Sequence, residues 1–503
     1  MKKLKLIFAA LLSILFAFSF GKVSADDSTT YTLTINGTPS DHVYSVYRIF
    51  AGNVSADGKT LSNIEWGSGV TPFEYNGSSD AATIAKALAS ESDDSTALQA
   101  FAATAAEKVT TNCTTVTSTA PSTTVTDLLP GYYLIKDVDT TQDGRDDSST
   151  RFILKLVVGN TTVEVKLDKP SVEKKVKDVN DTAGETTDWQ DSADYDINDS
   201  VPFQLTASLP SNIADYDEYY LELSDTLSAG LTYNKDARVY LVNGGDKKEV
   251  TSSFTIAADG SSFKINNLKS LTGVTASTKV VVEYTATLNE NAVVGAEGNP
   301  NKVKLVYSNN PNYTGKGEDS PKGETPEDTV IVFTYRLTVG KVDQDLKPLA
   351  GAAFTLFKKD VDGNWQTVKE YTVDDATAGK NSEVKNTFTF TGLDDGVYKL
   401  EETTTPNGYN TIKPIELTIT AEHTVLSDSP TLDKFEVTMR GSGQLTNQSM
   451  GIKGYAAFDV INKKGSILPS TGGVGTTILY IIGAVLVLAS SALLITRKRM
   501  TAE

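Results

Sequence analysis

Apolar and polar residues alternate with a period of two along most of this 503-residue chain. The pattern is clear in YTLTI at 31–35, VVVEYTATL at 280–288 and FTFTGL at 388–393. A strand with this alternation buries one face and exposes the other. Glycine, asparagine and aspartate turns separate the short stretches, so the sequence predicts a mainly β protein built of β-sandwich domains in series.

Two interruptions divide the alternating pattern into domains. One is Pro170, which lies between two predicted strands, and the other is the polar, proline-rich segment 311–329. We therefore expect domains at 26–169, 170–334 and 335–465. An alanine-rich segment, 80–109, has helical spacing and predicts a helical insertion in the first domain.

The N-terminus carries the features of an export signal. Three lysines precede an apolar stretch at 6–20, and Val23-Ser24-Ala25 supplies a small-residue cleavage site. This order is typical of a secretory signal peptide, which we assign to residues 1–25. The protein is therefore expected outside the cytoplasm.

The net charge and the cysteine count exclude one class of partner and one means of stabilisation. The net charge is −18, which argues against nucleic acid as a partner. Cys113 is the single cysteine, so no disulfide can form within the chain, and we interpret it as a strand residue. An exported protein of several domains without disulfides must obtain its durability in another way.

The C-terminus combines a pentapeptide, an apolar run and a basic tail. The pentapeptide is Leu468-Pro469-Ser470-Thr471-Gly472, and the uncharged run 478–496 is long enough to cross a bilayer of ~30 Å. The basic residues 497–499 would remain in the cytoplasm. Together these parts, at 466–503, resemble the sorting signal read by sortases of Gram-positive bacteria. The resemblance implies cleavage between Thr471 and Gly472, transfer of the Thr471 carbonyl to an amine, and anchoring in the cell wall after a transient membrane stage.

Alternation places three polar side chains on the buried faces of predicted strands in the third domain. They are Lys341 near the start of the domain, Glu402 in its middle and Asn462 at its end. Burial lowers the pKa of an amine and raises that of a carboxylic acid, so a neutral Lys341 could attack the Asn462 carboxamide beside a protonated Glu402. The product would be a Lys341–Asn462 isopeptide bond. A buried, fully hydrogen-bonded cluster without chemistry is the other interpretation.

The segment YKLEETTTPNGY, at 398–409, resembles a known signature. It is similar to the E-box, Tyr-x-Leu-x-Glu-Thr-x-x-Pro-x-Gly-Tyr, of collagen-adhesin B-type (Cna B) domains in surface proteins and pilins. Thr405 stands where a smaller residue is usual. The resemblance implies an Ig-like sandwich and assigns Glu402 the autocatalytic role.

The middle domain repeats this arrangement in a looser form. Lys174, Asp225 and Asn309 each continue an apolar face, and Lys175 or Asn301 would replace Lys174 or Asn309 if the register slipped. The pattern resembles collagen-adhesin A-type (Cna A) domains, in which a Lys–Asn bond forms beside an aspartate. In the first domain the opening strand, YTLTING, carries no lysine, so we expect no such bond there.

The whole layout resembles the major, or backbone, subunit of sortase-assembled pili. In that family a lysine at the end of the first domain, in a Val-x-Val-Tyr-Pro-Lys motif, accepts the threonine carbonyl of the next subunit. Here VEVKLDKP, at 163–170, retains only the Val-x-Val part, and the candidate acceptors are Lys169, then Lys166, then Lys175.

The resemblance also implies the partners. They are other copies of the chain in a head-to-tail covalent polymer, a pilus-class sortase, a housekeeping sortase, minor pilins, peptidoglycan and host surface receptors, with adhesion to host cells as the supported role.

The alternative function is a monomeric wall-anchored adhesin of the same domain type. We expect neither a conventional enzyme nor a cofactor, because only His42 and His423 are present and no nucleophile motif or phosphate loop is found. We also expect no metal site. The acidic segment 137–147 is only faintly similar to a calcium loop, with Thr150 where a bidentate glutamate is required.

Overall fold

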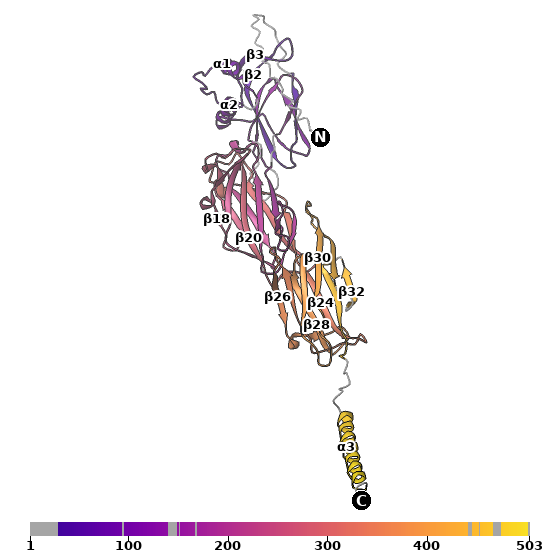
Figure 1. Cartoon of the computed structure of the whole chain (residues 1–503). Helices are drawn as coiled ribbons and strands as arrows, with labels where there is room; N and C mark the ends of the chain where they lie inside the picture. The colour runs from indigo at the N-terminus through magenta and orange to yellow at the C-terminus, as the bar shows by residue number, and fades with distance from the viewer. Residues whose placement is uncertain are drawn as a thin grey trace.

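The computed structural model describes residues 29–92, 95–138, 148–149, 151–165, 169–440, 445–451, 453–465 and 474–500. The strands form three groups that follow one another along an elongated molecule, with a separate C-terminal helix at the far end (Figure 1). We refer to the groups as domain 1 (31–164), domain 2 (171–333) and domain 3 (335–462). The predicted mainly β architecture with serial domains is confirmed.

Domain 1 contains two sheets and two helices. One sheet has the order β5-β1-β8, and the other has the order β3-β2-β6-β7 with β4 paired to β2. The elements are β1 (Tyr31–Asn36), β2 (Val43–Val54), β3 (Leu61–Trp66), α1 (Ala81–Leu88), α2 (Thr96–Glu107), β4 (Thr114–Thr117), β5 (Ser122–Leu128), β6 (Gly131–Asp137), β7 (Ile153–Val157) and β8 (Thr161–Glu164).

The predicted helical insertion is therefore two helices. Asp80 caps α1 by accepting a hydrogen bond from Thr83 N at 2.8 Å, and Ser95 caps α2 by accepting one from Leu98 N at 3.1 Å. Side-chain oxygens at these positions satisfy amide groups that have no partner within the helix. The apolar faces of both helices contribute to a core that includes Phe50, Phe101 and Leu134.

Domain 2 is a two-layer sandwich. One sheet has the order β12-β23-β21-β14-β19-β18, with β22 paired to β21. The other has the order β17-β16-β20-β13-β9, with β15 paired to β20. Strands β10 and β11 form a separate pair. The strands are β9 (Ser171–Val176), β10 (Val179–Asn180), β11 (Glu185–Thr186), β12 (Ser192–Asp194), β13 (Ser200–Ser208), β14 (Leu221–Leu227), β15 (Leu231–Tyr233), β16 (Arg238–Asn243), β17 (Asp246–Glu249), β18 (Thr255–Ile256), β19 (Ser262–Ile265), β20 (Lys279–Leu288), β21 (Asn299–Ser308), β22 (Lys322–Glu324) and β23 (Asp328–Phe333).

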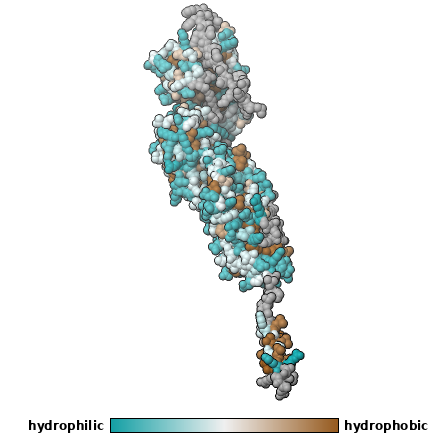
Figure 2. Space-filling view, viewed as in Figure 1, coloured by the Kyte–Doolittle hydropathy of each residue, from teal (hydrophilic) through white to brown (hydrophobic). Residues whose placement is uncertain are grey.

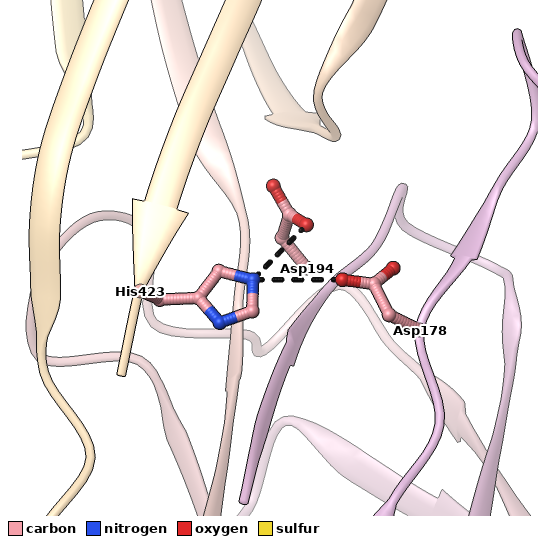
Figure 3. Close-up of side chains that lie close together, drawn as sticks. All are labelled: Asp178, Asp194 and His423. Carbon is pink, nitrogen blue, oxygen red and sulfur yellow. Dashed lines mark ion pairs between the residues drawn. The ribbon is translucent and has the colours of Figure 1, made fainter. Parts of the chain in front are cut away.

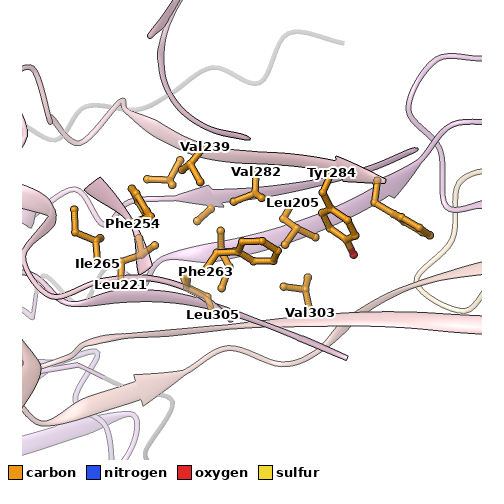
Figure 4. Close-up of a cluster of buried hydrophobic side chains, with 14 of the residues drawn as sticks. Leu205, Leu221, Val239, Phe254, Phe263, Ile265, Val282, Tyr284, Val303 and Leu305 are labelled. Carbon is orange, nitrogen blue, oxygen red and sulfur yellow. The ribbon is translucent and has the colours of Figure 1, made fainter. Parts of the chain in front are cut away.

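The core of domain 2 lies between these sheets. Figure 4 shows inward side chains of both layers meeting, among them Leu205, Phe263, Val282 and Leu305, all fully buried. Alternate residues on each strand supply these contacts, as the period of two predicts.

Domain 3 is a second sandwich of two five-stranded sheets, with the orders β27-β28-β24-β33-β32 and β26-β25-β29-β30-β31. Its first and last strands, β24 and β33, lie side by side and run parallel. The strands are β24 (Tyr335–Asp343), β25 (Ala353–Lys359), β26 (Trp365–Tyr371), β27 (Thr377–Ala378), β28 (Lys385–Leu393), β29 (Gly396–Thr404), β30 (Ile415–His423), β31 (Leu432–Arg440), β32 (Leu445–Gly451) and β33 (Tyr455–Asn462).

Backbone hydrogen bonds join successive domains. Ser149 N donates to Asn309 O at 2.8 Å between domains 1 and 2, and Ile197 N donates to Gly392 O at 3.1 Å between domains 2 and 3. Asp191 N also donates to Val425 O, at 2.9 Å. The domains are therefore in direct contact.

The C-terminal helix α3 (Val474–Met500) contains one candidate membrane span, Thr477–Lys498, with a mean hydropathy of 2.6. Its apolar surface is exposed and separated from the domains (Figure 2). The predicted apolar run at 478–496 falls within this span.

Candidate cross-linking sites in domains 2 and 3

Three strands bring Lys341, Glu402 and Asn462 together inside domain 3. Lys341 and Asn462 lie on the neighbouring parallel strands β24 and β33, and Glu402 lies on β29 of the opposite sheet. Lys341 and Asn462 are fully buried, and Glu402 is 9% exposed. All three side chains point inward, as the alternation predicts.

The carboxylate of Glu402 holds the carboxamide of Asn462. Asn462 Nδ2 donates to Glu402 Oε1 at 2.8 Å and to Oε2 at 3.1 Å. Ile412 N and Thr405 Oγ1 donate to Oε2 at 3.1 and 3.2 Å, which fixes the carboxylate from the loop that follows β29. Asn462 Oδ1 accepts no hydrogen bond from the described residues.

Lys341 is held beside this pair by backbone carbonyls. Its Nζ donates to Val460 O at 2.8 Å and to Val342 O at 3.2 Å, and Val460 is two residues before Asn462 on β33. Burial lowers the pKa of Lys341 to about 8, although Glu402 opposes the shift. The amine therefore loses its proton far more readily than an exposed lysine does.

Domain 2 contains a corresponding cluster that spans both sheets. The fully buried Lys174 on β9 donates to Asp225 Oδ1 of β14 and, at 3.2 Å, to the Tyr284 hydroxyl of β20. Tyr284 donates to Asp225 Oδ2 at 2.5 Å, and Asn301 Nδ2 donates to the Tyr284 hydroxyl at 2.8 Å. Asn301 is fully buried, and its Oδ1 accepts no hydrogen bond from the described residues.

Burial dominates the electrostatics of this cluster. It lowers the pKa of Lys174 to about 8 against the attraction of Asp225, and it raises the pKa of Asp225 against the attraction of Lys174. Both shifts favour the uncharged amine and the uncharged acid.

The asparagine in this cluster is Asn301, which the sequence analysis named as the residue that would replace Asn309 if the strand register slipped. The structure does not bring Asn309 close to Lys174. In the pairing of β14 with β21, Asn301 lies opposite Leu227, next to Asp225. Asn309 follows the other end of β21, where its carbonyl accepts from Ser149 of domain 1. Eight residues of extended strand separate the two asparagines by about 26 Å, which is beyond the reach of a lysine side chain.

Domain 1 has no such cluster among its described residues. Its lysines at 59, 86, 108, 136 and 155 are all at least partly exposed. Its buried polar residues include His42 and Asp137, in which the imidazole Nδ1 lies 2.7 Å from Asp137 Oδ2.

The candidate acceptor lysines occupy different environments. Lys169 is exposed, just before Pro170 at the junction of domains 1 and 2. Lys175 forms ion pairs with Asp191 at 2.5 Å and Glu173 at 3.3 Å. Lys166, the pentapeptide 468–472 and most of the acidic segment 137–147 lie outside the described residues.

Two buried polar residues, one in the domain 2 cluster and one at the joint of domains 2 and 3, escaped the sequence analysis. Tyr284 shares the inward face of β20 with Val280 and Val282, so alternation indicates its burial but not its hydrogen bonds. Lys358 is a third buried lysine, 5% exposed. It forms ion pairs with Asp196 at 2.6 Å and Asp394 at 3.0 Å at the joint of domains 2 and 3, which only the packing of two domains could reveal.

Comparison with known proteins agrees with this architecture. Residues 335–429 match the SpaA prealbumin-like fold domain, and residues 197–311 match the Cna-B-like domain of Gram-positive pilin backbone subunit 2. The second description differs from the A-type domain that the sequence analysis expected in this part of the chain.

Individual relatives cover most of the chain. The trypsin-resistant surface T6 protein of Streptococcus pyogenes serotype M6 is 26% identical over 412 residues, which cover 68% of this chain and 71% of the relative. The solved T6 backbone pilin of the same serotype has a TM-score of 0.53 at 20% identity and covers 88% of this chain and 100% of that one. The major pilin SpaD of Corynebacterium diphtheriae has a TM-score of 0.47 at 16% identity, with 88% and 99% coverage.

The serial sandwiches and the two domain matches make this chain similar to the multidomain pilins of Gram-positive bacteria. Among these proteins the chain is similar to the backbone pilins, whose domain model matches residues 197–311. Backbone pilins are structural proteins and not enzymes, and they polymerise with copies of themselves.

Proposed function

We propose that this chain is the repeating subunit of a covalently polymerised pilus shaft, in which each copy is closed by internal Lys–Asn bonds. The observation that carries the proposal is the recurrence of a buried lysine, carboxylate and asparagine in two successive domains. In both domains the lysine lies on the first strand, whereas the asparagine lies on the last strand of domain 3 and on β21 of domain 2, which β22 and β23 follow. The C-terminal signal, LPSTG followed by a span, supports covalent attachment.

The proposed reaction in domain 3 joins Lys341 Nζ to the side-chain carbon of Asn462. The C–N bond to Asn462 Nδ2 breaks, and ammonia leaves with a proton that Glu402 relays from Nζ to Nδ2. Both oxygens of Glu402 accept a hydrogen bond from Asn462 Nδ2, so this side chain is placed to pass the proton to the departing nitrogen. The low pKa of Lys341 supports its role as a neutral nucleophile.

The proposed reaction in domain 2 joins Lys174 to Asn301, with Asp225 relaying the proton. The Tyr284 hydroxyl supports this assignment because it contacts the amine, the carboxylate and the carboxamide. It would position the asparagine rather than exchange its own proton.

These bonds would suit a fibre under tension. In domain 3, force that enters at β24 and leaves at β33 would pass through the amide instead of separating the strands. Bond closure across the 121 residues between Lys341 and Asn462 would also restrict the unfolded chain, by about 4–5 kcal/mol on the analogy of a disulfide.

Between subunits, we propose that a sortase transfers the Thr471 carbonyl of one copy to Lys169 of the next. Its exposure and its place just before Pro170, at the junction of domains 1 and 2, support Lys169, whereas Lys175 is only partly exposed. A donor at one end and an acceptor near the other would give a head-to-tail contact that extends without closing. Attachment of the completed shaft to peptidoglycan would use the same threonine.

Alanine replacement of the acceptor lysines in the producing bacterium tests this linkage. We expect Lys169→Ala to remove the high-mass ladder that wall extracts give on a denaturing gel, because no amine then receives Thr471. Lys175→Ala is the matched control and should retain the ladder.

The remaining outcomes separate the alternatives. A ladder that persists in Lys169→Ala and is lost in Lys166→Ala would move the linkage to Lys166. Single chains from cells with the unaltered sequence would contradict the shaft function and support the monomeric adhesin.

A further inference from the structure

A cluster of acidic side chains and one histidine lies at the joint of domains 2 and 3. His423 ends β30 of domain 3, whereas Asp178 and Asp194 belong to domain 2 (Figure 3). His423 Nε2 lies 3.5 Å from Asp178 Oδ2 and 3.6 Å from Asp194 Oδ1. The three side chains are 8%, 15% and 4% exposed, respectively. We call these three residues the joint triad.

The hydrogen bonds of Ser192 fix the orientation of the imidazole. The Ser192 hydroxyl donates its single proton to Thr424 O at 2.8 Å, so it can only accept from His423 Nδ1, which is 2.7 Å away. Nδ1 therefore carries a proton, and Nε2 is the nitrogen that faces the two carboxylates.

The spacing within the joint triad is wide for direct hydrogen bonds. Nitrogen and oxygen in such a bond are normally 2.7–3.2 Å apart, and here both distances are longer. An ion bound at about 2.0–2.2 Å by the nitrogen and by each oxygen would leave the ligand atoms about 3.5 Å apart. Nε2 and one oxygen of each carboxylate lie within 4.8 Å of one another, as three ligands of one ion would.

One carboxylate oxygen of the joint triad and the hydroxyl of Tyr335 have no close hydrogen bond among the described residues. The carboxylate oxygen is Asp194 Oδ2, and Tyr335 is fully buried. Burial, followed by the charge of Asp194 and a side-chain hydrogen bond to it, raises the pKa of Tyr335 well above its usual value, so the hydroxyl faces this carboxylate. Unsatisfied buried oxygens of this kind are costly unless a further group binds them.

Negative charge around the joint triad also exceeds positive charge. Asp394 and Asp395 of domain 3 approach Asp194 closely enough for one oxygen of each residue to lie within 4.8 Å of the others. The nearby Lys358 is already paired with Asp181, Asp196 and Asp394. A divalent cation would offset this excess and link carboxylates of both domains.

We propose that the joint triad is a site for a divalent metal ion of the zinc class, with His423 Nε2, Asp178 and Asp194 as ligands. The imidazole ligand favours Zn²⁺ over Ca²⁺, which prefers oxygen ligands. Asp395 or a water molecule completes the coordination. Because His423 comes from one domain and the two aspartates come from the other, the ion clamps the joint. The proposal departs from the sequence-based expectation of no metal site, and the measurements below decide between the two.

Metal binding by the full chain tests the site directly. The untagged chain is purified in detergent, stripped with EDTA and equilibrated with ZnCl₂ by dialysis. We expect one tightly bound equivalent of Zn²⁺, at least tenfold weaker binding in His423→Gln and in Asp178→Asn, and no tight binding of Ca²⁺. The matched control Glu422→Gln changes an exposed carboxylate of the same strand and should bind as the unaltered chain does.

A spectroscopic measurement avoids dependence on variants. The chain has two histidines, so ¹⁵N-histidine labelling gives two imidazoles to follow. We expect Zn²⁺ to shift the Nε2 signal of one imidazole, while its Nδ1 keeps its proton. No stoichiometric zinc, together with an imidazole protonated on both nitrogens and unchanged by zinc, would overturn the proposal and leave a histidinium paired with two aspartates.

Discussion

Domain 1 and domain 3 both enclose a buried polar cluster between two sheets, but the groups in the clusters differ. Domain 1 buries His42 against Asp137, whereas domain 3 buries Lys341, Glu402 and Asn462. An imidazole and a carboxylate can share a proton, but neither carries a leaving group. A neutral amine next to a carboxamide can form a new amide and release ammonia. The difference shows that burial alone does not prepare a cross-link, because the nucleophile and the electrophile must both be present.

Domain 2 refines the comparison because it uses the same groups in another arrangement. Lys341 and Asn462 lie on adjacent strands of one sheet, whereas Lys174 and Asn301 come from opposite sheets. A bond in domain 3 would tie the two ends of the domain, and a bond in domain 2 would tie its two layers. The predictions below test this contrast, beginning with the largest effect.

When single chains are pulled from both ends, domain 1 should unfold under force, whereas the cross-linked segments of domains 2 and 3 should not. We expect domain 1 to unfold and lengthen the chain by on the order of 400 Å, because no bond spans it. The segments 174–301 and 341–462 should not extend, because an amide closes each of them. Asn462→Ala should add one further extension of similar size, measured by force spectroscopy, and its absence would contradict the proposed bond in domain 3.

Thermal unfolding should show how much each proposed bond stabilises its domain. Asn462→Ala should lower the free energy of unfolding of domain 3 by about 4–5 kcal/mol, and its melting temperature by roughly 10–20 °C, because the unfolded chain is no longer closed. Asn301→Ala should have a comparable effect on domain 2, as followed by scanning calorimetry. Asn309→Ala is the matched control, and an equal loss in that variant would restore Asn309 as the partner of Lys174.

Much of this could be predicted from the sequence, because strands of regular alternation fix which side chains point inward. Lys341, Glu402 and Asn462 each end an uninterrupted apolar face, so their burial followed directly. Alternation could not choose between Asn301 and Asn309, since their positions differ by eight, an even offset, and both side chains are buried. Only the pairing of β21 with β14 decides which asparagine is near Lys174.

The joint triad could not be predicted in the same way. His423 ends a strand of domain 3, and Asp178 and Asp194 lie more than two hundred residues earlier. No local pattern indicates that they meet, because their proximity depends on how domain 3 packs against domain 2.

The variant Asn462→Ala cannot form the bond in domain 3, and its free energy of unfolding should depend on pH through Lys341. Burial holds the pKa of this amine at about 8 in the folded chain, against an ordinary value of 10.5. Between these values the unfolded chain binds the extra proton, so the stability of Asn462→Ala should rise with pH from about 8 to about 10.5, by up to roughly 3 kcal/mol. Below about pH 8, the full free-energy cost of burying the Lys341 amine lowers the stability of this variant.

Chemical denaturation across this pH range measures the effect. The double variant Lys341→Met, Asn462→Ala is the control and should lack the rise, because no buried amine remains. A rise of equal size in the double variant would assign the effect to other groups.

The smallest expected effect concerns the helices of domain 1. Ser95→Ala removes the side-chain cap of α2 and should cost domain 1 about 1 kcal/mol. Because domain 1 has no proposed cross-link, limited proteolysis should cut it faster in this variant and leave domains 2 and 3 unchanged. Equal acceleration in all three domains would show that they do not unfold independently.

The central claim is that domains 2 and 3 each convert one buried lysine to an amide and that domain 1 converts none. Mass spectrometry of the exported chain tests it most directly. We predict an intact mass about 34 Da below that of the processed sequence, since each bond releases ammonia of about 17 Da. Fragmentation should give two branched peptides, Lys174 with Asn301 and Lys341 with Asn462. An intact mass equal to that of the processed sequence, with only linear peptides from domains 2 and 3, would contradict the account.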